Sequence, residues 1–438
     1  MEILCAEYVV PVDKTMTVYS PGAVVVDGKL IKDIGAKGDI LTKYTDVKIK
    51  DFGASIIMPG CVNTHSHMPM ILTRGLGDDR ELIDWLNNFV FPLEAQLLSA
   101  EYCHDAAIAG SAELLRHGFT SVLDMYYYTD NVAQACVETG IRAWLSCAVV
   151  DFPTKEFQTP RHALASTDEG IKRWASDPRI NVLVALHSTY TVSPDILMLG
   201  KEVANKNNSL IHIHLAESDQ ELKSVHEKYG KHPVQLLYDL GFMGKEVIAA
   251  HCVKLETEHI AMLKETDTAI SHNPCSNLKL ASGIAPITEL KKQGIRVGLG
   301  TDGPMSSNRL DPFHAMDIAA KVQKCVTNEP AVLPASEMIR MATIDGARVL
   351  QADDKIGSLE PGKIADLIVV DYARGKFSEI HDVYVHLVYA CHGEMVTDVM
   401  VDGNWVIQNE EFKTIDIEKI CSYEKKWSTK INNIVATL

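Results

Sequence analysis

The sequence lacks the features that mark membrane proteins and nucleic-acid-binding proteins. None of its apolar runs approaches the roughly 18 residues of a membrane span, and no run of lysine and arginine offers a surface for a polyanion. Its 42 basic residues against 58 acidic ones give a formal charge of −16, which argues against nucleic acid as the main partner. We therefore expect a small-molecule substrate, neutral or cationic, and no membrane.

The sequence also lacks a cysteine pattern for disulfides or for a zinc knuckle. Its ten cysteines include no Cys-x-x-Cys pair, and several lie inside apolar runs, as buried thiols in a reducing compartment do. The first twenty residues carry Glu2, Glu7 and Asp13 and no basic segment followed by an apolar stretch, so no signal peptide is expected. These features predict a cytoplasmic location.

Eight short apolar segments, rich in β-branched residues, alternate with helical patterns in the middle of the chain. The expected strands cover residues 56–63, 120–125, 141–149, 180–186, 210–215, 247–250, 268–271 and 297–300. The expected helices cover residues 100–117, 165–176, 194–206, 219–240, 256–265 and 286–294. Strand and helix alternating eight times is the pattern of an α/β fold of the (β/α)8 TIM-type barrel class. The segments 126–135 and 152–166 are expected to be loops over the site.

The two ends of the chain differ from its middle. Residues 1–55 and the segments 357–371 and 398–406 alternate short apolar runs with turn residues, which predicts hairpins and not βαβ units. We expect residues 1–55 and 350–438 to form one small β-sandwich domain beside a catalytic barrel of residues 56–349. An amphipathic C-terminal helix is expected against that small domain, with the apolar residues Ile417, Ile420, Tyr423, Trp427 and Ile431.

Side chains that bind metals recur where the expected strands end. The carboxyl ends of barrel strands meet on one face, where active sites form, and a His-x-His pair puts two imidazoles on one side of an extended strand. Three histidines with one carboxylate suit a divalent ion of the zinc or iron class. The strand-end residues are His65, His67, His187, His214, Glu217, His251, His272 and Asp302.

Taken singly, each of these residues has a purely structural explanation. A histidine at a strand end is commonly a hydrogen-bonded loop residue, which suits His187 and His272. Asp302 precedes Gly303, and Asp-Gly is a common turn dipeptide. Glu217 precedes the helix expected from Asp219 and suits a helix cap. Their shared position at successive strand ends favours one joint site over separate structural roles.

The motifs around these residues resemble those of the amidohydrolase superfamily. They are His65-x-His67, residues 211–217, Ala250-His251-Cys252, residues 271–279 and residues 300–303. More narrowly, the chain is similar to the branch of methylthioadenosine/S-adenosylhomocysteine deaminases, which is related to the triazine chlorohydrolases. The resemblance runs through nearly the whole chain, including residues 359–367, and implies a hydrolase acting on C–N bonds.

The resemblance implies one divalent ion per chain, held by His65, His67, His214 and Asp302. Zinc is the expected ion, with iron and manganese as alternatives. One ion is expected because the fourth strand ends in His187, where binuclear members have a carboxylated lysine that bridges two metals. His272 is expected to support the ligands from behind.

The resemblance also assigns the acid–base chemistry. Asp302 would take the proton of the attacking water, and His251 would orient that water and stabilise the developing charge. Glu217 would protonate the ring nitrogen next to the attacked carbon and then help the amine to leave. Asp302 and Glu217 would therefore also contact the substrate.

The implied substrate is a nucleoside. Glu94 is similar to the residue that accepts hydrogen bonds from ribose hydroxyls in adenosine-type deaminases, although an acid at a helix start is its structural alternative. His187 is implied as a second substrate contact, on the purine or ribose side. Trp85 and Phe89 are candidates to line the same mouth, although packing of their helix explains them equally well.

One departure from the family pattern concerns the 5′ group of the substrate. Cys147 stands where an arginine is expected, and Arg161 is the nearest candidate for a second arginine. Such arginines would bind the amino-acid tail of S-adenosylhomocysteine, since guanidinium suits a carboxylate. The loss of one favours uncharged 5′ groups, as in methylthioadenosine, 5′-deoxyadenosine or adenosine.

We therefore expect hydrolytic deamination of 5′-modified adenosines to the inosine analogues. The alternatives are a hydrolase of another amino- or chloro-substituted heterocycle (triazine, guanine or pterin) and a non-catalytic scaffold barrel. The resemblance alone suggests a homo-oligomer.

Overall fold

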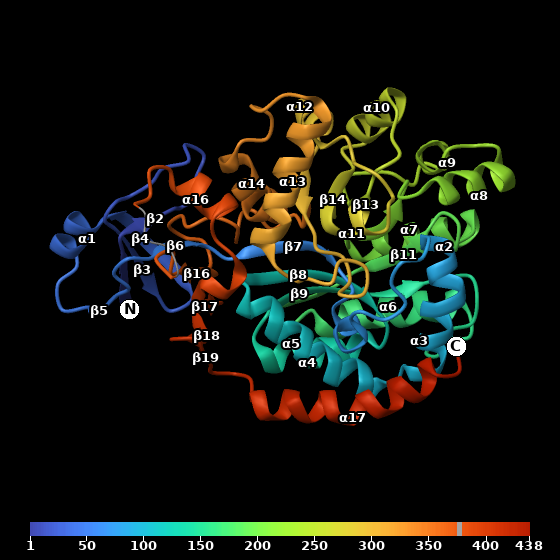
Figure 1. Ribbon diagram of the computed structural model, residues 1–438, viewed down its shortest axis with the longest axis horizontal. Coiled ribbons are helices and arrows are strands. Elements are labelled where there is room, and N and C mark those ends of the chain that lie inside the picture. Colours follow the sequence, from blue (N-terminus) through green and yellow to red (C-terminus); the bar gives the residue numbers. More distant parts are fainter. Residues whose placement is uncertain (375–378) are drawn as a thin grey trace.

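The computed structural model describes residues 1–374 and 379–438 and shows a barrel with β-sheets beside it (Figure 1). No helix within these two ranges has the length and apolar character needed to cross a membrane.

Eight parallel strands, each hydrogen-bonded to the next in chain order, form the barrel. They are β7 (Cys61–Ser66), β8 (Phe119–Tyr126), β9 (Arg142–Val149), β11 (Val184–Ser188), β12 (Ile211–Leu215), β13 (Val247–His251), β14 (Ala269–His272) and β15 (Val297–Leu299). The first and last strands meet where the backbone N–H groups of Thr301 and Asp302 donate to the carbonyl of His65, over 3.2 and 3.0 Å. The predicted (β/α)8 barrel is confirmed.

Helices cover the outside of the barrel. After β7 come η1 (Met68–Thr73), α2 (Leu82–Trp85), η2 (Leu86–Val90), α3 (Phe91–Leu97) and α4 (Ala100–Arg116). Between β8 and β13 lie α5 (Thr129–Thr139), α6 (Pro160–Trp174), α7 (Pro194–Asn207), α8 (Asp219–Tyr229) and α9 (Pro233–Asp239). The remaining ones are α10 (Thr257–Glu265), α11 (Pro274–Lys279), α12 (Ile287–Lys292), α13 (Pro312–Thr327), α14 (Ala335–Ala342) and α15 (Ile344–Val349).

Several expected elements differ from the observed ones for local reasons. The helix expected over 219–240 is two helices, because Gly230 turns left-handed at φ 67° and Pro233 starts the second one. The segment 126–135, expected as a loop, contains most of α5, and α6 begins inside the loop expected over 152–166.

Two expected strands are each divided in the structure. Of the strand expected over 56–63, only β7 enters the barrel, because β6 (Ile56–Pro59) pairs with β16 (Leu367–Val370) in another sheet. Gly60 allows this change of sheet, since a Cβ there would lie 2.2 Å from the Thr120 side chain. The strand expected over 180–186 is β10 (Ile180–Val182), which pairs with β9, and then β11.

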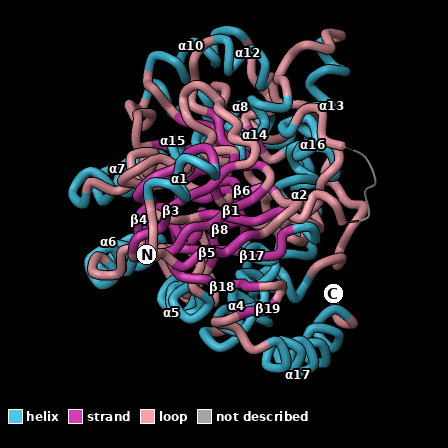
Figure 2. The backbone as a smooth tube through the Cα atoms, turned by 90° about the vertical axis from the view of Figure 1, so that its left-hand side faces the viewer, coloured by secondary structure: helices cyan, strands magenta, loops and turns pink. Residues whose placement is uncertain are grey.

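The two ends of the chain build two further sheets, whose strands lie together in Figure 2. One has the order β4-β3-β1-β5 and the other β19-β18-β17-β16-β6-β2. The remaining strands are β1 (Glu2–Ala6), β2 (Tyr8–Val9), β3 (Gly22–Asp27), β4 (Leu30–Ala36), β5 (Lys48–Asp51), β17 (Val396–Val401), β18 (Asn404–Gln408) and β19 (Glu411–Phe412). The short helix α1 (Lys37–Lys43) packs on β3 and β4, whereas α16 (Val383–Tyr389) and η3 (Gly393–Met395) contact the barrel helix α13.

The two terminal sheets share one apolar core. Leu4 and Val24 of the first sheet pack in one buried cluster with Ile57, Leu367 and Met400 of the second. A small sheet domain assembled from both termini, as predicted, is therefore confirmed. Its boundaries at residues 55 and 350 stay a prediction.

The C-terminal helix forms where it was expected but packs elsewhere. This helix, α17 (Ile417–Val435), runs beneath α4 in Figure 1 and contacts α3 and α4 of the barrel. The Trp427 indole donates to the buried Asp105 carboxylate over 2.9 Å and meets the Tyr102 ring edge-on. This anchoring on α4 is why the helix covers the barrel and not the small domain.

A buried ion pair joins the barrel to the terminal sheets. The Arg142 guanidinium, from β9, donates through Nε to Asp366, just before β16, over 2.8 Å. Nη2 of Arg142 lies 3.5 Å from Oδ1 of Asp402. The side chains of Arg142 and Asp366 are only 4% and 2% exposed. A buried charge that loses its partner is strongly destabilising, so this pair stabilises the junction only while it is complete.

We expect Arg142→Ala to lower the free energy of unfolding by about 3–5 kcal/mol, because it leaves buried carboxylates without a cation. The measurement is the thermal unfolding midpoint of the purified protein. Arg173→Ala is the matched control, since it removes an exposed arginine paired with Asp130 and should cost at most about 1 kcal/mol. Equal shifts for the two variants would contradict the importance of the buried pair.

Candidate metal centre and active site

The predicted site residues meet at the carboxyl ends of the barrel strands. His65 lies on β7, His214 on β12 and His251 ends β13, while Asp302 follows β15. The backbone is left-handed at Ala216, His251 and Asp302, with φ of 51°, 73° and 62°. Such conformations cost non-glycine residues on the order of 1–3 kcal/mol each, and they cluster at functional sites.

Three histidines point their Nε2 atoms toward one place because their Nδ1 atoms are held from outside. Nδ1 of His67 lies 2.6 Å from the carbonyl of Met125, and Nδ1 of His214 lies 2.7 Å from the carbonyl of His187. A carbonyl only accepts, so both Nδ1 atoms carry a proton and both rings turn Nε2 toward the shared space. His65 is held similarly, with its Nδ1 3.0 Å from Nε2 of His212.

The carboxylate of Asp302 faces the same place. Its Oδ1 lies 3.2 Å from Nε2 of both His65 and His67. Its Oδ2 accepts hydrogen bonds from the hydroxyls of Ser276 and Ser306, over 2.6 and 2.8 Å. Burial alone would raise the pKa of Asp302, but the two imidazoles bring that pKa well below its usual range, so Asp302 is an anion.

These four residues fit a divalent metal ion. Nε2 of His67 and Nε2 of His214 are 3.3 Å apart, although each Nδ1 already carries the ring proton. Nε2 of the fully buried His65 has no hydrogen-bond partner. Converging ring nitrogens and a carboxylate, buried together, are satisfied by a cation, and three nitrogens with one oxygen match the zinc class of donors.

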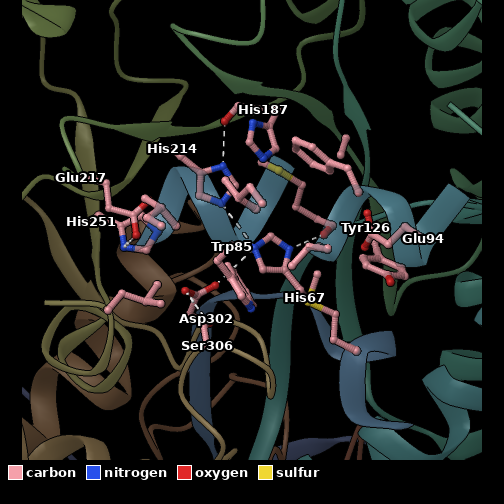
Figure 3. A pocket seen from close by; sticks show the side chains of 18 of the residues that line it. His67, Trp85, Glu94, Tyr126, His187, His214, Glu217, His251, Asp302 and Ser306 are labelled. Atoms are coloured by element: carbon pink, nitrogen blue, oxygen red, sulfur yellow. Dashed lines mark hydrogen bonds and ion pairs between the residues drawn. The ribbon is translucent and has the colours of Figure 1, made fainter. Parts of the chain in front are cut away.

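Glu217 and His251 lie on one side of these donors, as Figure 3 shows. The two side chains are 3.7 Å apart at Glu217 Oε1 and His251 Nδ1. Nδ1 of His251 also lies 2.8 Å from Oδ1 of Asn277, so its Nε2 is left to face the donors. Burial raises the pKa of Glu217, although the charge of His251 opposes this. A buried acid with a raised pKa therefore stands beside the metal donors.

Glu94 lies on the opposite side of the pocket, beside Tyr126 (Figure 3). It comes from α3, is buried, and its Oε1 has no hydrogen-bond partner. Burial raises the pKa of Glu94 to about 7, and the Tyr126 hydroxyl acts in the opposite direction. An unsatisfied buried carboxyl oxygen in a pocket wall suits a ligand that brings a hydrogen-bond donor.

The other predicted substrate contacts divide into two groups. His187 and Trp85 line the pocket together with Glu94, Glu217 and Asp302. Arg161 does not, because it is exposed at the second position of α6. The structure also keeps Phe89 out of the lining, in contact with Arg80. His272, expected to support the ligands, is buried near His251, whose charge adds to burial in lowering the pKa of His272 to about 3.

No lysine or arginine lines the pocket among the residues that the structure describes. Cys147, where an arginine is expected, contacts Glu156 instead, with Sγ 3.8 Å from the carboxylate. Burial raises the pKa of Glu156 to about 7. The nearby lysines Lys155 and Lys228 line two separate cavities beside the pocket.

Several contributors to the site have no signal in the sequence. Phe91, Tyr126, Tyr127 and Tyr190 line the pocket, but they follow no motif. Ser276 and Asn277 belong to the motif of residues 271–279. The sequence does not show that Ser276 contacts Asp302 and that Asn277 contacts His251. Other residues in contact with the predicted site residues, His212, Glu221 and Ser306, were also not predicted from the sequence.

The model of the amidohydrolase family matches residues 56–406 of the chain. The chain belongs to the amidohydrolase family. The match spans the whole barrel and the sheet strands β6, β16 and β17 on either side of it. It confirms the resemblance that the motifs indicate.

Named relatives share nearly the full length of the chain. A 5-methylthioadenosine/S-adenosylhomocysteine deaminase of Thermodesulfovibrio yellowstonii is 39% identical over 433 residues, covering 98% of this chain and 99% of that protein. A 5′-deoxyadenosine deaminase of Methanosarcina acetivorans is 38% identical over 418 residues, covering 94% of each chain. The crystal structure of an adenosine deaminase from Xanthomonas campestris with bound zinc superposes with a TM-score of 0.96 at 32% identity, over 99% of this chain and 98% of that one.

We expect His214→Ala to lose its divalent ion on dialysis against a chelator at a concentration that the wild-type protein withstands, because only three of the four donors remain. His187→Ala is the matched control. It should keep its ion, since the contact that fixes Nδ1 of His214 comes from the backbone carbonyl of His187, which the substitution keeps, and the His187 ring only packs beside the His214 ring. The measurement is the metal content per chain by mass spectrometry, and loss of the ion from both variants would contradict the assigned donor set.

Proposed function

We propose that this protein hydrolyses adenosine nucleosides with an uncharged 5′ group to the corresponding inosines and ammonia. The observation that carries the proposal is the pocket itself, in which metal donors, a buried acid and an unsatisfied carboxyl oxygen face one space. The relatives named as deaminases of methylthioadenosine and 5′-deoxyadenosine support it.

The proposed ion is zinc, held by His65, His67, His214 and Asp302. Three nitrogens and one oxygen are typical zinc donors, and the related adenosine deaminase has zinc bound; iron and manganese also accept this donor set. The chemistry that such an ion supplies when bound is a hydroxide nucleophile at neutral pH.

Glu217 is the proposed general acid. Burial raises its pKa, which favours the protonated form that delivers a proton to the ring nitrogen next to the attacked carbon. Protonation of that nitrogen lets the ring accept hydroxide at the neighbouring carbon, which becomes tetrahedral. Glu217 then assists proton delivery to the amino group, and the C–N bond breaks with release of ammonia.

Asp302 and His251 are proposed to handle the attacking water. Asp302 is an anion, and its Oδ2 is fixed by the Ser276 and Ser306 hydroxyls, so it is placed to accept the proton of the water. His251 is held by Asn277 through Nδ1 and turns its other nitrogen to the same space, where it orients the water and stabilises charge.

Glu94 and His187 are proposed to hold the nucleoside. Oε1 of Glu94 is the buried acceptor without a partner, which suits a ribose hydroxyl donor. His187 lines the pocket from the end of β11, and burial lowers its pKa to about 3, so it stays neutral. Trp85 adds an apolar surface from α2.

The pocket favours an uncharged 5′ group. A carboxylate on the substrate would find no lysine or arginine in the described lining, and the Cys147 position offers a contact with Glu156 in place of a cation. We propose that S-adenosylhomocysteine is a poor substrate. The cysteine pattern of the sequence supports a cytoplasmic location, and a homo-oligomer stays a prediction.

The deciding experiment measures ammonia release by metal-quantified protein with methylthioadenosine, 5′-deoxyadenosine, adenosine, S-adenosylhomocysteine, guanine and a chlorotriazine. We expect kcat/KM above about 10⁴ M⁻¹ s⁻¹ for the first three. S-adenosylhomocysteine should be at least about tenfold worse, because a charged hydrogen bond of roughly 1.5–3 kcal/mol has no partner. Equal turnover of S-adenosylhomocysteine would contradict the proposed selectivity and would point to Lys155 and Lys228 as its partners. Turnover of guanine or the chlorotriazine alone would contradict a nucleoside substrate.

Glu94→Ala tests the ribose contact separately from the chemistry. We expect it to raise KM for the preferred adenosine by about 10- to 100-fold, because one or two hydrogen bonds to a charged group are lost. Glu101→Ala, at an exposed position on the neighbouring α4, is the matched control and should leave KM unchanged. An unchanged KM in Glu94→Ala would contradict a ribose-binding role.

A further inference from the structure

Glu221 is a buried acid that the proposed reaction does not use. Its side chain belongs to α8, and the residue has no exposed surface. It forms no ion pair with a lysine or arginine in the part of the chain that the structure describes. Burial of an unpaired carboxyl group is costly, so its contacts need an explanation.

The Glu221 carboxylate accepts two hydrogen bonds, one at each oxygen. The backbone N–H of Glu217 donates to Oε2 over 2.8 Å, and the hydroxyl of Thr189 donates to Oε1 over 2.9 Å. Thr189 directly follows β11, whereas Glu217 follows β12. One side chain therefore ties the proposed general acid to the end of the neighbouring strand.

The contacts of the Glu221 side chain differ from those of a helix capping box. Ser218-x-x-Glu221 has the spacing of a helix capping box, in which the glutamate would accept from the backbone N–H of the serine. The Ser218 hydroxyl does accept from the backbone N–H of Glu221, over 3.2 Å. The Glu221 side chain, however, reaches one residue further back, to the N–H of Glu217.

The other side of the same turn is fixed by the next strand. The backbone N–H groups of Val253 and Lys254 donate to the carbonyl of Ala216 over 2.9 and 2.8 Å, just beyond β13. Ala216 itself is left-handed, a conformation that the surrounding structure must maintain. Glu217 is thus held between the end of β13 on one side and the Glu221 carboxylate on the other.

We propose that Glu221 is a positioning residue, which holds Glu217 in the orientation that lets it reach the substrate ring. The inference rests on the proposed function, since it gives Glu217 the role of general acid. Burial raises the pKa of Glu221 to about 7, and the bonds from Glu217 and Thr189 oppose that rise.

Two substitutions at Glu221 separate position from charge. Glu221→Gln keeps both contacts, because the amide oxygen of the new side chain accepts from Glu217 and its NH₂ group donates to the Thr189 hydroxyl. Glu221→Ala loses both. For the best adenosine substrate, we expect kcat to fall by about 10- to 100-fold in Glu221→Ala, with KM within about threefold, since a misplaced catalytic group costs on the order of 10²-fold. Glu221→Gln should stay within about threefold of the wild-type protein.

Hydrogen exchange of residues 215–221, measured by mass spectrometry on metal-loaded protein, gives a readout that needs no substrate. We expect faster exchange in Glu221→Ala and wild-type exchange in Glu221→Gln. Thr189→Val, which removes one of the two donors, should show the intermediate result and serves if Glu221→Ala does not fold. Asp219→Asn, an exposed residue of the same helix paired with Lys254, is the control and should change neither readout.

The outcomes are distinguishable. Wild-type kcat and exchange in both Glu221→Ala and Thr189→Val would overturn the proposal, and so would equal losses in Glu221→Ala and Glu221→Gln, because charge and not position would then be the cause. If the wild-type protein releases no ammonia from any adenosine, the proposed function fails, and the exchange measurement alone decides whether Glu221 holds the turn at Glu217.

Discussion

The site depends on holding three imidazole rings so that their Nε2 atoms converge on one space. Each ring is fixed from behind through Nδ1: His67 by the carbonyl of Met125, His214 by the carbonyl of His187, and His65 by His212. Backbone carbonyls cannot donate, so they determine which nitrogen carries the proton. The metal donors are therefore specified by the positions of neighbouring strands, and the barrel must be intact before the donors converge.

The contacts that close the barrel also bring the proposed metal donors together. The carbonyl of His65 accepts from the backbone of Thr301 and Asp302, and Asn63 exchanges hydrogen bonds with Thr301 through its side-chain amide. These contacts join the first strand to the last. Without these contacts, Asp302 would not lie beside His65. The proposed set of donors would then have no negatively charged member.

The sequence sufficed for the parts of the molecule that depend on local pattern. The apolar periodicity predicts the barrel, and the strand-end positions of His65, His214 and Asp302 predict that they meet, because the carboxyl ends of parallel strands share one face. What it did not predict are contacts made by side chains whose partners are distant in sequence. Asn277 and Glu221 look like ordinary polar residues of short helices until the turn beside them is placed.

Other differences between the predicted and the observed elements arise because a segment can pack against more than one neighbour, and only the fold decides which. Residues 56–63 form one apolar run, yet the run divides at Gly60, since β16 offers Ile57 a partner that the barrel does not. The amphipathic pattern of α17 identifies a helix but not its neighbour, which Asp105 determines by accepting from Trp427. Arg161 is the arginine nearest to the position that the family pattern implies, but its place on α6 leaves it in solvent.

The pairing of β6 with β16 has a consequence for synthesis of the protein. Ile57 lies opposite Val369 in this ladder, so the strand that leads into the barrel waits for a partner that is synthesised after all eight barrel strands. At about 5–20 residues per second, the interval is on the order of 15–60 s. During that time β6 presents an apolar strand edge of the kind that invites intermolecular pairing. The edge of β6 that pairs with β16 therefore stays open while the barrel strands are synthesised.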